Sequence, residues 1–198
     1  MKCVFSLFTL AMSGVFFCGC SLLPVPADRQ TVYHDIGFPS KTFDLPKPVF
    51  VRQFDGSVGD RTKMCFRAAG NVVRPDSFNR WSQPPASLLQ RYLMLALHGV
   101  DGGEPATDAK AGLIEINGTL IRFDGGLEEK KVTICALVIA ATPGRRLVER
   151  KTLFREVFTV SAPFDGKTAV SFSEAMGEAA SSLAEKIAAR IKEVDGKR

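Results

Sequence analysis

Apolar and polar residues follow one another in the first part of the chain in a way that is typical of β-strands. Two runs rich in β-branched and aromatic residues, at 31–37 and 49–54, predict the first two strands, and the proline-rich segment between them predicts an extended connection. A third strand is expected over 62–68. A turn at Gly70-Asn71 then leads into a short strand over 72–74, so the third and fourth strands are expected to form a hairpin.

The next segment has the features of a helix start. Ser82 is the expected N-cap, and Pro84 and Pro85 fall in the first turn, where a missing N–H costs no hydrogen bond. Apolar residues then recur at steps of three and four, and Gly99 with the run DGGEP at 101–105 ends the pattern. The apolar side of this helix is expected to pack into the core.

Three long strands are predicted next, over 111–123, 130–140 and 146–160. The first alternates apolar and polar residues, which indicates a half-buried strand, whereas the second is apolar on both sides and is expected to be central. Asp124-Gly125-Gly126 and Pro143-Gly144 have the composition of reverse turns, so the three strands are expected to form an antiparallel meander. A phosphate-binding loop at the first of these turns is disfavoured, because no helix follows it.

A second helix is expected over 168–193, opened by a capping box of Ser171 and Glu174. Its apolar residues recur at three- and four-residue steps and are expected to pack onto the sheet: Phe172, Met176, Ala179, Leu183, Ile187 and Ile191. Together these elements predict an α/β fold of the α+β type. It would be a single domain with a mixed, mostly antiparallel sheet and two main helices packed on one face.

The first twenty residues have a different character. Lys2 precedes an apolar stretch, Val4–Phe17, that is shorter than the roughly 20 residues needed to span a bilayer. Gly19 and Cys20 then resemble a lipobox, in which a small residue precedes the cysteine that receives lipid. Cys18 is a poorer candidate, because a bulky phenylalanine precedes it. The alternatives are an ordinary secretory signal and an uncleaved anchor.

A lipobox at this place divides the chain into a lipoprotein signal peptide (1–19), a lipidated N-terminus with a flexible tether (20–30) and a periplasmic domain (31–198). Ser21, rather than an aspartate, follows the lipidated cysteine, which favours sorting to the outer membrane over retention in the inner membrane. We therefore expect a protein that is lipid-anchored at the outer membrane and faces the periplasm.

Composition and charge narrow the classes of function. The net charge of +5 is modest and does not form a basic stripe, so nucleic acid is not an expected partner. Cys65 and Cys135 either pair or stay as two separate buried thiols, and the separate thiols are favoured. His34 and His98 are isolated, and no cysteine or histidine pair has metal-ligand spacing. No metal or cofactor is therefore expected, apart from the covalent lipid on Cys20.

One segment, 64–97, carries a more specific arrangement. An arginine in a strand (Arg67) is followed by a short turn, an arginine–tryptophan pair (Arg80-Trp81) and a double proline that opens a helix (Pro84-Pro85). This arrangement resembles the ABC-type transport auxiliary lipoprotein family (PqiC-like lipoproteins), and the order of the later strands and the closing helix is similar as well. The run FDGGLEE at 123–129 departs from that family, in which a longer hairpin is expected.

The resemblance implies an accessory role without ATPase or permease activity, which agrees with the lack of a Walker A motif in the sequence. It implies an outer-membrane partner of a mammalian-cell-entry (MCE) domain protein, in a system that moves lipids or other hydrophobic compounds between membranes. A tube-shaped partner of this kind favours a ring-shaped homo-oligomer.

Two other classes of function remain open from the residues alone. One is a lipid-binding carrier or a lipopolysaccharide-assembly lipoprotein, which would share the anchor and the fold class. The other is an enzyme, which is the weakest candidate because the sequence has no G-x-S-x-G motif and no distinctive carboxylate pair.

The residues of the 64–97 segment have two interpretations each. Trp81 either pins the helix start onto the sheet, which is favoured, or forms a partner-binding hot spot. Arg67 and Arg80 either stack on Trp81 or pair with acidic residues. Pro84 and Pro85 either shape a rigid turn or form an exposed docking edge beside the tryptophan.

Overall fold

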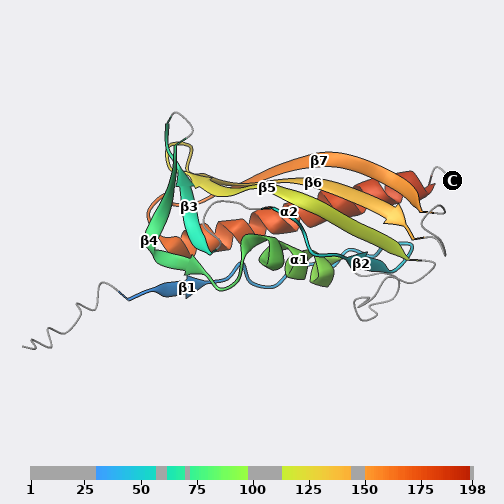
Figure 1. The fold of residues 1–198 in the computed structure, drawn as a ribbon, viewed down its shortest axis with the longest axis horizontal. Coiled ribbons are helices and arrows are strands. Elements are labelled where there is room, and N and C mark those ends of the chain that lie inside the picture. The colour runs from blue at the N-terminus through green and yellow to red at the C-terminus, as the bar shows by residue number, and fades with distance from the viewer. Residues whose placement is uncertain (1–29, 57–61, 70–71, 98–112, 144–149, 197–198) are drawn as a thin grey trace, which may run out of the picture. The chain divides into compact units, whose positions relative to one another are not determined.

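The computed structural model describes residues 30–56, 62–69, 72–97, 113–143 and 150–196. The chain divides into a short unit, Met1–Gln30, and a second unit, Thr31–Arg198, which contains every described helix and strand. The second unit is an α+β domain, in which a mixed sheet of seven strands packs with two helices (Figure 1). The fold class predicted from the sequence is therefore confirmed.

The sheet has the spatial order β1-β4-β3-β5-β6-β7, and β2 also pairs with β5. Its strands are β1 (Val32–His34), β2 (Val49–Val51), β3 (Lys63–Arg67), β4 (Val73–Trp81), β5 (Ile114–Gly126), β6 (Lys131–Thr142) and β7 (Lys151–Pro163). The three long strands β5, β6 and β7 form the expected antiparallel meander, and β3 and β4 are also antiparallel. The pairs β1–β4, β2–β5 and β3–β5 are parallel, which makes the sheet mixed.

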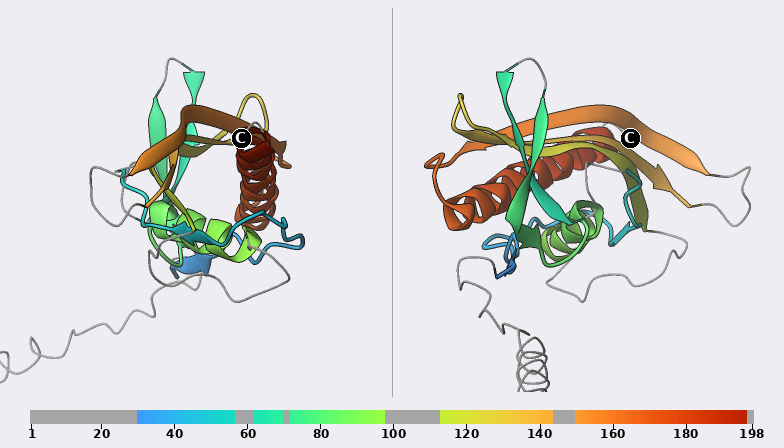
Figure 2. Two further views of the ribbon diagram at one scale, coloured as in Figure 1. Left: turned by 90° about the vertical axis from the view of Figure 1, so that its right-hand side faces the viewer. Right: turned by 60° about the vertical axis from the view of Figure 1, so that its left-hand side comes forward.

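Two helices pack on one face of the long strands. The helix α2 (Ala169–Gly196) runs along β5, β6 and β7, and α1 (Pro85–Ala96) lies beside it (Figures 1 and 2). The six apolar residues predicted to face the core from α2 are all buried. Every residue of the described hydrophobic core lies between Ile36 and Ile191, so the domain keeps this core without the residues that precede Thr31.

The turn predicted at Asp124-Gly125-Gly126 is wrong, because these residues are the last three of β5 and the turn follows at 127–130. Gly125 lies against the ring of Phe172, where an added Cβ would come within 2.3 Å of Cε2. Glycine is needed here for the close approach of the helix to the strand rather than for a reverse turn. The expected turn at Pro143-Gly144 extends into residues that the structure does not describe.

The fourth strand is much longer than the predicted 72–74. Asp76 interrupts its alternation, because its Oδ1 atom accepts hydrogen bonds from the backbone N–H groups of Phe78 (2.8 Å) and Asn79 (2.7 Å). The register with β3 shifts at this place, and the strand then continues to Trp81 beside β1. Pairing on both sides therefore extends a segment whose own pattern does not predict a strand.

Both predicted helix caps are wrong. The N-cap of α1 is Pro84, which makes no side-chain cap, and the Ser82 hydroxyl lies elsewhere. At the start of α2, the Thr168 hydroxyl accepts a hydrogen bond from the Ser171 N–H (3.1 Å), so the cap lies three residues earlier than the predicted box. The glycine expected to end α1, Gly99, lies outside the described residues, and the helix ends at Ala96.

Cys65 and Cys135 lie in different strands of the sheet and are not bonded to each other. Cys65 is buried in β3, and Cys135 is half-buried in β6. The disulfide is therefore not formed, as the favoured interpretation predicted, although only one of the two thiols is fully buried.

Candidate functional site

Trp81, the last residue of β4, is fully buried. Its ring meets Phe123 of β5 edge-on, with 5.3 Å between ring centroids, and lies 5.6 Å from the ring of Phe172 in α2. The indole Nε1 has no hydrogen-bond partner. Pro85 is buried as well, and only Pro84 is exposed, so the structure has no exposed Trp-Pro-Pro docking edge.

Arg67 and Arg80 do not stack on Trp81, and the two arginines contact different residues. Arg67 pairs with the buried carboxylate of Asp124 (2.8 Å), which also receives the Arg122 Nε–H (2.7 Å). Arg80 donates from Nη1 to the backbone carbonyl of Asp76 (3.0 Å). Of the two interpretations offered by the sequence, pairing with an acidic residue therefore holds for Arg67 as an ion pair and for Arg80 as a longer-range interaction with the charge of Asp76.

The structure brings Trp81 together with the first strand of the domain. β1 pairs with the end of β4 in parallel, and His34 is the register partner of Trp81. The His34 ring nitrogen Nε2 lies 2.9 Å from Asn79 Oδ1, and the Ser82 N–H donates to the His34 carbonyl (2.8 Å). We call this region, residues 32–38 and 79–82 with Arg91, the corner.

Asp35 joins the corner to α1. Its Oδ2 atom accepts a hydrogen bond from the Ser82 hydroxyl (2.7 Å), and its Oδ1 atom accepts one from the Gly37 N–H (2.8 Å) and one from the Arg91 guanidinium. The Arg91 guanidinium also lies over the Phe38 ring, 5.5 Å from its centroid. Because Arg91 belongs to α1, these contacts fix the segment that follows β1 on the helix.

The contacts of Asp35 make part of the fold's stability depend on pH. Burial alone would raise the pKa of this carboxyl, but the hydrogen bonds from Arg91, Ser82 and Gly37 and the charge of Arg91 outweigh it, so the pKa lies below its ordinary value of 3.8. A carboxyl whose pKa is lower in the folded chain stabilises the fold above the unfolded pKa. This contribution is lost as pH falls through the folded pKa.

Replacing Asp35 by asparagine is therefore expected to lower the free energy of unfolding at neutral pH, and the deficit is expected to shrink below about pH 4. Urea unfolding of both proteins at about pH 7 and about pH 3 measures this. Asp44→Asn, at an exposed position, is the control and should show no such convergence. A deficit of Asp35→Asn that is the same at both pH values would contradict the assignment.

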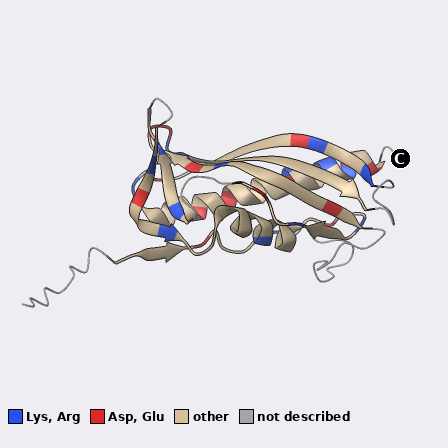
Figure 3. Ribbon diagram, in the orientation of Figure 1, with Lys and Arg blue, Asp and Glu red and all other residues tan. Residues whose placement is uncertain are grey.

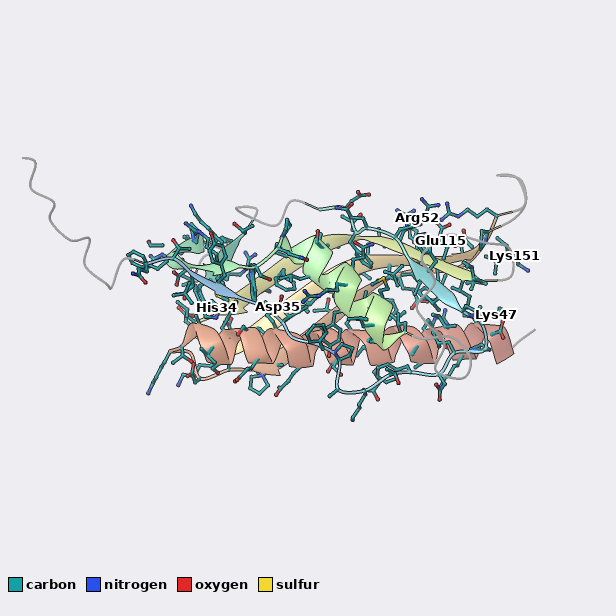
Figure 4. The ribbon with its side chains drawn as sticks, turned by 90° about the horizontal axis from the view of Figure 1, so that it is seen from below. His34, Asp35, Lys47, Arg52, Glu115 and Lys151 are labelled. Atoms are coloured by element: carbon teal, nitrogen blue, oxygen red, sulfur yellow. The ribbon has the colours of Figure 1, made fainter. Side chains whose placement is uncertain are left out.

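Sequence patterns did not identify Asp35 or Arg91. They also did not identify Glu115, which is buried like Asp124. Glu115 lies on the polar side of β5 but is 3% exposed, because Arg52 (2.8 Å) and Arg150 (2.7 Å) cover it. Figure 4 shows Glu115 and Arg52 at the opposite end of the domain from His34 and Asp35. The arginines that pair with Asp35 and Glu115 come from distant parts of the chain, so no local sequence motif indicates these ion pairs.

The described side chains offer little to a catalytic or metal site. No three His, Cys, Asp or Glu residues in the described ranges are grouped as metal ligands would be. Neither of the two described helices combines the length and the apolar character needed to cross a membrane. The described polar contacts of this region are ion pairs and hydrogen bonds that join strands to α1, around packed aromatic rings.

Comparisons with known proteins identify the family. A family model described as the ABC-type transport auxiliary lipoprotein component matches residues 58–188, whereas no curated protein matches the sequence.

Two solved structures share the fold, each with a TM-score of 0.61. One is an uncharacterized protein with 12% identity, and the alignment covers 82% of this chain and 99% of that protein. The other is a protein from Xanthomonas campestris of family DUF330, with 11% identity and coverage of 85% and 100%. Because the family model matches more than half of the chain, the protein belongs to the ABC-type transport auxiliary lipoprotein family.

Proposed function

We propose that this protein is held at the outer membrane by lipid on Cys20, faces the periplasm and docks an MCE-domain protein of an ABC-type transport system. Its accessory role in transport follows from the family, and the match over residues 58–188 is the observation that carries the proposal. The finer assignment is that the system moves lipids or other hydrophobic compounds between the two membranes, and that this chain contributes no catalysis.

The sequence before the domain supports the anchoring. Gly19, Cys20 and Ser21 form the junction at which a lipoprotein signal would be cleaved, and Ser21 favours the outer membrane. A cysteine with several acyl chains holds a protein stably, since each buried CH₂ contributes about 0.8 kcal/mol. Residues 21–30 then connect the lipid to a domain that has its own core.

One face of the sheet supports the docking of a protein partner. The face of β5, β6 and β7 that points away from α2 carries Ile121 and Val157, which are 53% and 58% exposed. Leu137 of β6 is half-buried between them and is the register partner of Val157. Exposed apolar residues that gather on one face are typical of protein–protein contacts. We assign this outer face to the transport partner.

Cell fractionation of the full-length protein and its Cys20→Ala variant tests the anchoring. The unchanged protein is expected in the outer-membrane fraction and to incorporate labelled palmitate. The variant is expected to incorporate none and to leave that fraction. Cys135→Ala is the matched control, since it also removes one thiol from the chain but lies within the domain. Equal palmitate incorporation by the Cys20 variant would disprove the proposed anchor.

A further inference from the structure

The corner has an outward side as well as the side that packs on the core. Tyr33 of β1, Arg80 of β4 and Lys63 of β3 are register partners in one row across the three strands. Register partners point to the same side of a sheet, and the neighbours Trp81 and Met64, which point to the other side, are fully buried. The row therefore lies on the side of the sheet that faces away from the core.

Aromatic rings stand exposed on this row. Tyr33 is 67% exposed, and Phe78, two residues before Arg80 in the same strand, is 44% exposed. We call Tyr33, Phe78, Arg80 and Lys63 the outward row. Two exposed rings beside the Arg80 guanidinium make a surface that is both apolar and basic.

The charge of the surrounding strands is also positive. β1, β3 and β4 contain the cationic residues Lys63, Arg67, Arg74 and Arg80 and one acidic residue, Asp76 (Figure 3). Asp76 lies within this group of cations: its carboxylate accepts two backbone N–H groups of its own strand and interacts with the charge of Arg80. Arg67 is paired with Asp124, whereas Arg74 and Arg80 of β4 contribute positive charge to this part of the sheet.

The position of the outward row in the chain limits how far it can be from a lipid anchor. Residues 21–30 separate Cys20 from the domain, and a fully extended chain of this length spans at most about 36 Å. Tyr33 follows within three residues, and the contacts of His34 and Asp35 fix β1 on the domain. Of the described strands, β1, which carries Tyr33, is therefore the one that follows Cys20 most closely in the sequence.

We propose that the outward row lies against the phospholipid surface to which Cys20 is anchored. Tyrosine and phenylalanine rings are favourable in the interfacial layer, and the Arg80 guanidinium beside them is placed to meet lipid phosphates. This inference rests on the proposed anchoring. It adds that the anchor and the outward row together orient the domain on the membrane.

Fluorescence quenching in the full-length lipidated protein tests the contact. Tyr33→Trp places an indole in the outward row, and Val157→Trp, at a similarly exposed position on the outer face, is the matched control. Both variants keep the buried Trp81 as a constant background. In vesicles of phosphatidylethanolamine and phosphatidylglycerol with brominated acyl chains, the introduced indole of Tyr33→Trp is expected to be quenched about threefold more than that of Val157→Trp. Adding Phe78→Ser to the Tyr33 variant is expected to reduce this quenching.

Equal quenching of the two indoles would overturn the proposal. Cross-linking of position 33 to a second copy or to another protein, without quenching of the Tyr33→Trp indole by lipid, would also overturn the proposal. It would mean that a protein and not lipid covers this position. Failure of the anchor itself is distinguishable, because both variants would then fail to float with the vesicles. Anchored protein that floats but shows no difference in quenching would overturn the membrane contact alone.

Discussion

Replacing Trp81 by alanine is expected to lower the free energy of unfolding by about 3–5 kcal/mol. The ring is fully buried and touches Phe123 and Phe172, so its removal leaves a cavity where β4, β5 and α2 meet. Because Nε1 has no partner, Trp81→Phe loses volume but no hydrogen bond and is expected to cost less. Urea unfolding followed by circular dichroism measures both changes.

Tyr33→Ala is the control for the tryptophan, since it removes an aromatic ring that is 67% exposed. It is expected to change the free energy of unfolding by no more than about 0.5 kcal/mol. If Trp81→Ala left stability unchanged and weakened partner binding instead, the hot-spot interpretation would be right and the structural one wrong.

Replacing Asp124 by asparagine is expected to cost about 3 kcal/mol of stability. The carboxylate is 3% exposed and pairs with two arginines, Arg67 and Arg122, that are themselves about two-thirds covered. Removing its charge leaves two guanidinium groups close together without their counterion. The expected cost is at the lower end for buried pairs, because both arginines keep some contact with water.

Glu156→Gln is the matched control for Asp124→Asn. Glu156 also pairs with an arginine, Arg190, but its side chain is 39% exposed, so its loss is expected to cost at most about 1 kcal/mol. Chemical unfolding of the two variants under the same salt conditions compares them directly. Equal costs would mean that burial of Asp124 does not set the strength of its pairing.

Long periodic segments were predictable from the sequence because local pattern and tertiary packing agree in them. β6 is apolar on both sides and lies at the centre of the meander, and the apolar steps of α2 all face the core. Such segments bury the same residues whatever their neighbours are, so hydrophobic periodicity alone locates them.

The failures lie where a distant residue decides the local structure. Asp124-Gly125-Gly126 has turn composition, but Arg67 holds the aspartate and Phe172 occupies the space beside Gly125, so the strand continues. β4 extends beyond its predicted end because β1 supplies a partner strand from far away in the sequence. Turn propensity and strand propensity are weak compared with these contacts.

The candidate site was predictable only in part, for the same reason. The sequence singled out Trp81 and its neighbours, and the structure places that tryptophan in the core beside β1. It did not indicate that Asp35 and Arg91 join this strand to α1, because 56 residues separate the two partners. The outward row depends likewise on the register of three strands, which no single segment encodes.

Size-exclusion chromatography with light scattering, on residues 21–198 with and without a purified MCE-domain protein, tests the central claim most directly. These residues contain the whole described core, so the chain is expected to fold without its anchor. The account predicts a homo-oligomer, seen as a mass several times that of the single chain, that elutes together with the MCE-domain protein. It also predicts that Val157→Glu on the outer face weakens this complex. A strict monomer that does not bind the MCE-domain protein would contradict the account.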